Sequence, residues 1–325
     1  MYKVAVIGCG WIGLAHAQGY QAIKECSLEG AVDPAMDLAK KMTESYGGKA
    51  YASFEDMEKE FKPDIVSICT PPSLHETMVQ KALKAGVRWI VCEKPLAHSY
   101  ESASRIGDLV KSHGAVLMTA FCHRFAEPII RIREMIRSGE LGDIVIFRNE
   151  FASIFTGVQD RWFSKKDVSG GGTTIDTSVH SIDLFRFLCG EPKNVSARMA
   201  ARMPGLEVED TACLLLQTEG GTIGIIEASW NLAAGQAFVE VCGTKGRVSY
   251  QYWGPFRVIK NGDADWTSLT VERDINLRFE DELRNFVRVI EGKTSEYPCY
   301  DDGIQANRII QAAYQSIEKK TWIEI

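Results

Sequence analysis

A glycine-rich turn follows the first apolar run of the sequence. Gly8-Cys9-Gly10-Trp11-Ile12-Gly13 has the spacing Gly-x-Gly-x-x-Gly and comes directly after Val4–Ile7. Between a strand and a helix, the first glycine permits a tight turn, the second lets the backbone approach a pyrophosphate, and the third lets the helix pack closely. The helix N-terminus then faces the phosphates. The motif predicts a dinucleotide site that includes Gly8, Gly10, Trp11, Ile12 and Gly13; the alternative is a turn with only a structural purpose.

An acidic residue gives this motif the context that it requires. Leu28–Val32 is predicted to be the second strand, and Asp33 follows it, about 20 residues beyond the glycines. A carboxylate there accepts hydrogen bonds from the adenosine ribose and repels a 2′-phosphate. Because Pro34 rather than an arginine comes next, NAD is predicted as the cofactor over NADP, although Lys40 and Lys41 would soften that preference.

The pattern of apolar runs predicts two domains in a chain of 325 residues. Up to residue 120, short apolar runs alternate with longer amphipathic segments, which is typical of buried parallel strands joined by helices. Residues 1–120 are therefore predicted to form an α/β Rossmann domain with a doubly wound parallel sheet. Residues 121–325 are predicted to form an α+β domain with a largely antiparallel sheet, because strands follow one another through tight turns. The helices predicted in this half cover 127–138, 174–189, 279–291 and 302–319.

Composition and charge exclude several kinds of partner. The net charge is −6, and lysines and arginines are scattered, so neither nucleic acid nor an anionic membrane is expected to bind. No apolar stretch approaches the ~18 to 20 residues that span a bilayer, and the sequence does not open with a secretory signal. Nine cysteines without a C-x-x-C pair indicate reduced thiols, as in a cytoplasmic protein.

A proline-rich loop falls where ligands bind an open parallel sheet. Thr70-Pro71-Pro72 follows an apolar run that ends at Cys69, and ligands bind outside the carboxyl ends of such strands. Thr70, Pro71 and Pro72 are therefore candidate cofactor contacts, although a turn before a helix explains them equally well. His75 is either a further ligand contact or a surface histidine at a helix start.

Glu93-Lys94-Pro95 ends the next predicted strand at the same edge. A lysine there can hold a substrate hydroxyl beside a nicotinamide and favour negative charge on its oxygen. Glu93 and Lys94 are also candidate cofactor contacts. The alternative is a surface lysine at a strand end, and the sequence leaves open whether Pro95 is cis.

A glycine run and a polar helix form the last candidate site. Gly170-Gly171-Gly172 precedes Thr173 and predicts a helix start. On one helix, Asp176, His180 and Asp183 would share a face. Carboxylates beside an imidazole orient it and tune its pKa, which suits a general base. A solvated polar stripe is an equal alternative; a metal site is not predicted, because no cluster supplies further ligands.

Taken together and in order, these segments resemble the Gfo/Idh/MocA oxidoreductases, named after glucose-fructose oxidoreductase and inositol dehydrogenase. His123-Arg124-Phe125 adds to the match, whereas Cys122-His123 departs from many relatives. The resemblance implies a Rossmann domain followed by a domain with an open, mainly antiparallel sheet, commonly used to form dimers or tetramers. It also implies that Lys94 orients substrate and assists proton handling, that His180 is the general acid/base, and that Asp176 contacts substrate or supports His180.

The activity implied by the resemblance is an NAD-dependent dehydrogenase or reductase of a sugar, inositol or related polyol. His180 would remove the proton of a secondary hydroxyl while hydride passes to the nicotinamide. Arg124 and Trp162 are candidate substrate contacts. The alternatives are that Arg124 pairs with a carboxylate of the protein and that Trp162 belongs to the core. Two alternatives stay open: an NAD-dependent redox glycosidase of the same family, and a non-catalytic NAD-binding sensor. The sequence does not name the substrate.

Overall fold

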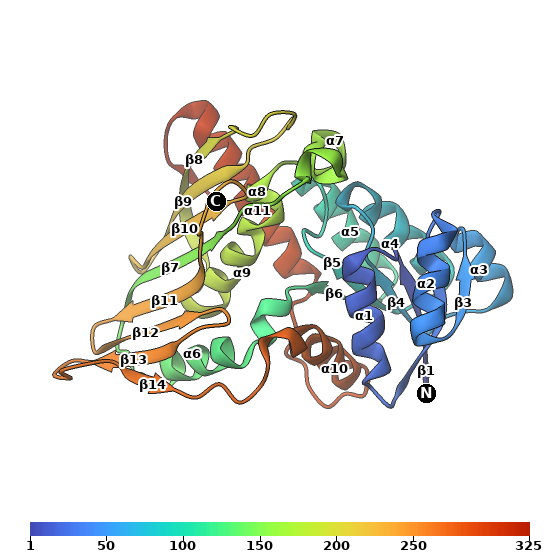
Figure 1. Cartoon of the computed structure of the whole chain (residues 1–325), viewed down its shortest axis with the longest axis horizontal. Coiled ribbons are helices and arrows are strands. Elements are labelled where there is room, and N and C mark those ends of the chain that lie inside the picture. Colours follow the sequence, from blue (N-terminus) through green and yellow to red (C-terminus); the bar gives the residue numbers. More distant parts are fainter. The chain divides into compact units, whose positions relative to one another are not determined.

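The chain folds into two compact units, each built from two stretches of sequence. The computed structural model describes residues 1–325 (Figure 1). The N-terminal unit comprises Met1–Cys122 and Asn276–Gln305, and the C-terminal unit comprises His123–Ile275 and Ala306–Ile325. The predicted boundary between 1–120 and 121–325 lies close to the observed boundary at Cys122. The prediction did not include residues 276–305 in the N-terminal unit, to which they belong.

A six-stranded parallel sheet forms the centre of the N-terminal unit. Its strand order is β3-β2-β1-β4-β5-β6, so the order reverses between β1 and β4. This is the doubly wound order in which ligands bind where the direction of winding switches, and the predicted Rossmann fold is confirmed. The strands are β1 (Tyr2–Ile7), β2 (Cys26–Val32), β3 (Lys49–Tyr51), β4 (Ile65–Ile68), β5 (Trp89–Glu93) and β6 (Val116–Ala120). The sequence pattern does not reveal β3, because this edge strand has only three residues and no apolar run.

Helices connect these strands and cover both faces of the sheet. They are α1 (Trp11–Gln21), α2 (Met36–Tyr46), α3 (Phe54–Glu60), α4 (His75–Lys84) and α5 (Tyr100–Ser112). Two of them start at serine caps: Ser53 accepts a hydrogen bond from the N–H of Asp56, and Ser99 accepts one from the N–H of Ser102. Such caps satisfy N–H groups that have no partner inside the helix.

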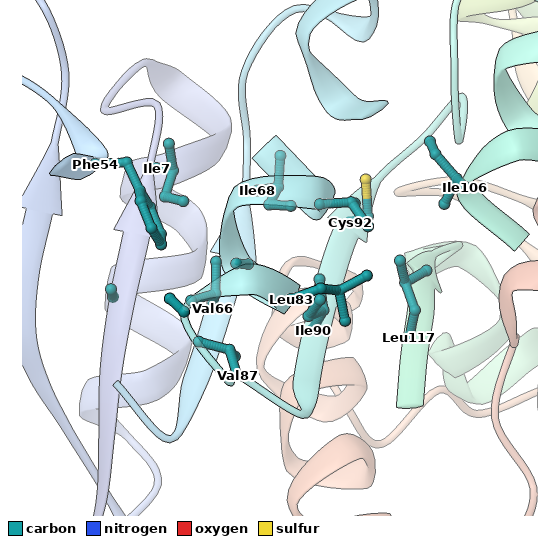
Figure 2. Packing of buried hydrophobic residues seen from close by; sticks show 14 of the residues in the cluster. Ile7, Phe54, Val66, Ile68, Leu83, Val87, Ile90, Cys92, Ile106 and Leu117 are labelled. Atoms are coloured by element: carbon teal, nitrogen blue, oxygen red, sulfur yellow. The ribbon is translucent and has the colours of Figure 1, made fainter. Parts of the chain in front are cut away.

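Alternate residues of the strands point to opposite faces of the sheet, and each set is buried. Figure 2 shows the residues buried on one face of the sheet. There Ile68, Cys92 and Leu117 from three neighbouring strands pack together with Leu83 of α4 and Ile106 of α5. All five side chains are at most 4% exposed. This packing fixes the strand ends that carry the candidate loops.

The opposite face of the sheet is covered partly by α10 (Arg278–Ile290), which arrives late in the chain. Leu283, Phe286 and Val287 of this helix pack with Val4, Tyr20, Ile23, Val91 and Met118. The helix lies so close to α1 that a Cβ on Gly19 would be 2.8 Å from a methyl carbon of Leu283. The apolar face of α10 therefore explains why the N-terminal unit is discontinuous in sequence.

The C-terminal unit contains a nine-stranded sheet in the order β14-β13-β12-β11-β7-β10-β9-β8-β15 (Figure 1). Every pairing is antiparallel except that of β7 with β10. The predicted mainly antiparallel sheet is confirmed. The strands are β7 (Ile144–Ala152), β8 (Pro192–Ala200), β9 (Thr211–Thr218), β10 (Ile223–Ser229), β11 (Ala237–Gly243), β12 (Gly246–Gln251), β13 (Phe256–Lys260), β14 (Thr267–Leu269) and β15 (Ile323–Glu324).

Helices of the C-terminal unit pack on one part of this sheet. They are α6 (Glu127–Arg137), α7 (Lys166–Ser169), α8 (Thr173–Asp176), α9 (Ser178–Cys189) and most of α11 (Tyr300–Lys319). The helix α9 lies on β7 and β10, where Phe185 meets Phe147 edge-on with ring centroids 5.6 Å apart. None of the helices in the structure is both long enough and apolar enough to cross a membrane.

Candidate active site

The loop between β1 and α1 is shaped by contacts that only glycine allows. Gly8 has a φ of +93°, and a Cβ there would lie 2.5 Å from the carbonyl oxygen of Cys69. A Cβ on Gly13 would lie 2.0 Å from the carbonyl oxygen of Gly8. Beside Gly10, the N-cap of α1, no atom outside its chain neighbours lies within 4 Å of the Cβ position. Open space along backbone at a helix N-terminus fits the pyrophosphate of a dinucleotide.

The residues between these glycines differ in exposure. Trp11 is 73% exposed and meets Phe279 of α10 edge-on, with ring centroids 5.9 Å apart. Ile12 packs against the core beneath the loop. Burial and the nearby Asp33 raise the pKa of the Cys9 thiol to about 12, so this thiol stays protonated. Contact of Trp11 and Ile12 with a cofactor stays a prediction.

Asp33 follows β2 and is held against the glycine-rich loop. One carboxylate oxygen accepts a hydrogen bond from the N–H of Cys9 at 2.8 Å, and the other accepts one from the N–H of Ala35 at 2.8 Å. The side chain is half-exposed. Because a carboxylate oxygen accepts more than one hydrogen bond, Asp33 can still bind ribose hydroxyls.

The loop after β4 is tied to the loop after β5 by His75. Its imidazole is fully buried: Nε2 lies 2.8 Å from the carbonyl oxygen of Thr70, and Nδ1 lies 3.1 Å from that of Pro95. Burial lowers the pKa of His75, although hydrogen bonds to backbone carbonyls oppose this shift. The interpretation of His75 as a surface histidine is wrong. Cofactor contact by His75, or by Thr70, Pro71 and Pro72, stays a prediction.

Lys94 follows β5 at the same edge, with a half-buried side chain and a cis peptide bond to Pro95. The carboxylate of Glu93 is 6% exposed and lies behind it. One of its oxygens accepts a hydrogen bond from the N–H of Lys94 at 3.1 Å, and the other lies 3.0 Å from Nε2 of His16. Both oxygens are thus engaged inside the fold, so the structure gives Glu93 a supporting position; its contact with a cofactor stays a prediction.

In the C-terminal unit, Asp176 and His180 do not share one helix. The helix α8 ends at Asp176, α9 begins at Ser178, and Thr177 lies between them with φ −100° and ψ −51°. The prediction of a single continuous helix over 174–189 is therefore wrong, although His180 and Asp183 both lie on α9. The hydroxyl of Thr177 accepts a hydrogen bond from the indole N–H of Trp230 at 2.9 Å.

The start of α8 is fixed by a carboxylate from another part of the chain. One oxygen of Glu209 accepts hydrogen bonds from the N–H groups of Gly172 and Thr174, at 3.1 and 3.0 Å, and from the Tyr314 hydroxyl at 2.9 Å. A Cβ on Gly172 would lie 1.8 Å from the Glu209 carbonyl oxygen. The glycine run thus allows close packing that caps the helix which ends at Asp176.

An aromatic cluster that includes His123, Phe151 and Tyr252 lies beside His180. The ring centroid of His180 lies 4.4 Å from that of His123 in an edge-on arrangement. His123 in turn packs 5.1 Å from Phe151, and its Nδ1 lies 2.7 Å from the hydroxyl oxygen of Tyr252. His123 belongs to a segment that the family resemblance had marked, but no local pattern points to Tyr252 or Phe151.

A cavity of about 500 Å³ lies within the C-terminal unit, beside Asp176. This volume falls in the range of roughly 300–1,000 Å³ that is typical of small-molecule sites. Its aromatic walls are Phe151, Phe155, Trp230, Tyr252 and Trp253. Its polar side chains are Asp176, Thr177, Ser153, Ser229, Gln236 and Gln251. Apolar ring faces beside hydroxyl, amide and carboxylate groups suit a ligand that has C–H faces and several hydroxyls.

Arg124 and Trp162 were the other candidate substrate contacts. The guanidinium of Arg124 makes a two-pronged ion pair with buried Asp183, with N···O distances of 2.8 and 2.5 Å. The alternative that Arg124 pairs with a carboxylate thus describes the structure. Trp162 is half-buried and stacks on Phe163, with ring centroids 3.7 Å apart. Neither side chain is among those that line the cavity, and their contact with substrate stays a prediction.

The parallel sheet, its glycine cradle and the acidic residue after β2 define a dinucleotide-binding Rossmann domain. Residues 2–121 match the family model described as "Oxidoreductase family, NAD-binding Rossmann fold", and residues 129–249 match "GFO/IDH/MocA C-terminal domain". The two models together cover well over half of the chain. The protein belongs to the Gfo/Idh/MocA family of NAD-binding oxidoreductases.

Individual relatives support this assignment. The chain is 27% identical to D-glucoside 3-dehydrogenase of Escherichia coli K12, covering 99% of this chain and 97% of that protein. It is also 27% identical to inositol 2-dehydrogenase of Rhizobium meliloti 1021, covering 99% of both. A solved structure of levoglucosan dehydrogenase in complex with NADH and levoglucosan matches with a TM-score of 0.92 at 24% identity, covering 100% of this chain and 99% of that one. This last similarity shows the shared fold.

Proposed function

We propose that this protein is an NAD-dependent dehydrogenase or reductase that acts on a secondary hydroxyl of a sugar, inositol or related polyol. The observation that carries the proposal is the cavity beside Asp176, whose aromatic and polar walls suit a polyhydroxylated ring. The names of two relatives, a glucoside dehydrogenase and an inositol dehydrogenase, support the same substrate class.

NAD is the proposed cofactor rather than NADP. The carboxylate of Asp33 is held at the end of β2 by the N–H groups of Cys9 and Ala35. A fixed negative charge there accepts hydrogen bonds from ribose hydroxyls and repels a 2′-phosphate. Asp37 adds a second carboxylate to the first turn of α2, whereas the lysines of that helix, Lys40 and Lys41, are exposed.

In the proposed reaction the substrate carbon loses a hydride and its hydroxyl loses a proton. NAD, when bound, is the hydride acceptor. His180 takes the hydroxyl proton as general base, and Asp176 accepts a hydrogen bond from the substrate at the cavity wall. The ammonium of Lys94 stabilises negative charge on the reacting oxygen. In the reverse direction His180 returns the proton as general acid.

A substrate screen tests the proposal. Purified full-length protein is mixed with NAD or NADP and with each of a panel of inositols, aldoses, sugar acids, glycosides and nucleotide sugars, and NADH formation is followed by absorbance. NADH formation with at least one of these compounds supports the dehydrogenase. If NAD binds but no compound yields NADH, cleavage of glycosides without net NADH would indicate the redox glycosidase. Binding without either reaction would indicate the sensor.

We also propose that the protein forms a dimer or tetramer through the open face of its larger sheet. On this face the apolar residues Leu215 and Ile223 are 38% and 39% exposed, on neighbouring strands β9 and β10. Exposed apolar side chains in such a row are typical of an interface. Light scattering coupled to size-exclusion chromatography measures the mass directly, and a monomer at micromolar concentration would contradict the proposal.

A further inference from the structure

A chain of buried polar side chains runs through the N-terminal unit and ends at the backbone of Lys94. The hydroxyl oxygen of Tyr20 lies 2.9 Å from Oγ of Ser67, which lies 3.2 Å from Nδ1 of His16. Nε2 of His16 lies 3.0 Å from Oε1 of Glu93, and Oε2 of Glu93 accepts the hydrogen bond from the Lys94 N–H. Tyr20, Ser67 and His16 are fully buried.

The chemistry of a carboxylate fixes the direction of the hydrogen bond between His16 and Glu93. An ionised carboxylate only accepts, so Nε2 of His16 must carry the hydrogen toward Glu93. Burial raises the pKa of Tyr20 well above its usual range. The hydroxyls of Tyr20 and Ser67 can each donate and accept, so each side chain of the chain has a hydrogen-bond partner inside the fold.

Packing alone does not account for this arrangement. Polar groups inside a sheet core lose their hydration, and apolar side chains of similar size would fill the same space without that cost. His16 also lies on α1, the helix that starts at the glycine-rich loop, whereas Glu93 ends β5. The hydrogen bond between them therefore links the start of the cofactor-binding segment to the loop that carries Lys94.

We infer that His16 is a positioning residue for Lys94. Its Nε2–H orients the Glu93 carboxylate, which accepts the hydrogen bond from the Lys94 N–H. This hydrogen bond fixes the backbone from which the Lys94 side chain and its ammonium group extend. This inference rests on the catalytic role proposed for Lys94. Displacement of a catalytic group by about 1 Å can lower the rate by up to about 10²-fold, while binding changes little.

Two amide substitutions at position 16 test the contributions of the two ring nitrogens separately. The side-chain nitrogen of His16→Gln reaches the place of Nε2 and can still donate to Glu93. The amide of His16→Asn reaches only the place of Nδ1 and loses that donor. We expect His16→Asn to lower kcat about 10- to 100-fold with little change in the KM values, and His16→Gln to recover most of this loss. Tyr20→Phe is the matched control, because it removes a hydrogen bond from the same chain without touching Glu93.

A spectroscopic readout makes the test independent of activity. In protein labelled with ¹⁵N-lysine, the Lys94 amide is assigned by its disappearance in Lys94→Arg. Its proton resonance should move upfield in His16→Asn and stay in place in His16→Gln and Tyr20→Phe, because only the first change frees the Glu93 carboxylate. If His16→Asn does not fold, Glu93→Leu carries the test, since its side chain has no acceptor for the Lys94 N–H.

The outcomes distinguish this inference from the proposed function. An unmoved Lys94 amide in His16→Asn, or an unchanged kcat in that variant while Lys94→Met is inactive, would overturn the positioning role alone. Full activity of Lys94→Met would instead overturn the catalytic role of Lys94, and the positioning role with it. Equal loss of kcat in His16→Gln, His16→Asn and Tyr20→Phe would show general damage to the core and would also overturn the inference.

Discussion

Replacement of Gly10 by alanine should separate cofactor binding from folding. The backbone of Gly10 has φ −71° and ψ −169°, which alanine adopts without strain, and the new methyl group would meet no atom of the protein within 4 Å. Folding should therefore be unharmed, or favoured by about 0.4–1 kcal/mol, because alanine restricts the unfolded chain. The methyl group would instead occupy the space through which a pyrophosphate approaches the loop.

The loss of NAD affinity can be estimated from the hydrogen bond that the methyl group would prevent. Loss of one hydrogen bond between a backbone N–H and a charged phosphate is worth about 1.5–3 kcal/mol, which corresponds to about 10- to 150-fold in the dissociation constant of NAD. Calorimetric titration of NAD measures this change, and urea denaturation without cofactor measures the free energy of unfolding.

Gly13→Ala is the matched control within the same loop. Its methyl group would be 2.0 Å from the carbonyl oxygen of Gly8, so the loop must shift, and the free energy of unfolding should fall by about 1–3 kcal/mol as in other overpacked sites. Wild-type NAD affinity in Gly10→Ala would refute the placement of the pyrophosphate at this loop. Loss of stability in Gly10→Ala would refute the claim that the space beside it is open.

Three further predictions concern charge and proton transfer. Asp33→Ala should weaken NAD binding and raise the affinity for NADP relative to NAD, since the repulsion of a 2′-phosphate is removed; an unchanged ratio in titrations with both cofactors would contradict this position for the ribose. His180→Ala should lower kcat about 10²- to 10⁴-fold with the substrate found by screening, while NAD affinity stays constant; an unaltered kcat would exclude His180 as the base. Burial holds the pKa of His75 below its ordinary value of 6.5, so the unfolded state takes up the proton first as pH falls. The free energy of unfolding should therefore decrease as pH drops below about 6.5, and denaturation curves should show this dependence flattened in His75→Gln; an equal slope in both proteins would rule out His75 as its source.

The parts of the site that could be predicted from sequence lie within short segments. The glycine-rich loop and Asp33 belong to one strand–helix–strand unit, where the function of each residue depends on its position relative to strand and helix ends. The strands β1, β2, β4, β5 and β6 could be predicted in the same way, from apolar runs. Each of these features is local, so the periodicity of the sequence reports it.

The remaining parts depend on contacts between distant segments. Tyr252 follows His123 by 129 residues, and Glu93 follows His16 by 77. Which side chains meet across such separations is decided by the topology of the sheets and by packing, neither of which has a local signature. The contact of Thr177 with Trp230, which directly follows β10, joins residues 53 apart and likewise has no local signature.

The late arrival of α10 has a consequence for synthesis on the ribosome. Val4, Tyr20 and Ile23 are made first, yet the side chains that cover them, Leu283 and Phe286, are translated more than 250 residues later. Until then, one face of the parallel sheet exposes apolar surface that invites association with other nascent chains or with chaperones. Completion of the cofactor-binding unit therefore waits for nearly the whole polypeptide, and a chain that stops before α10 should aggregate rather than bind NAD.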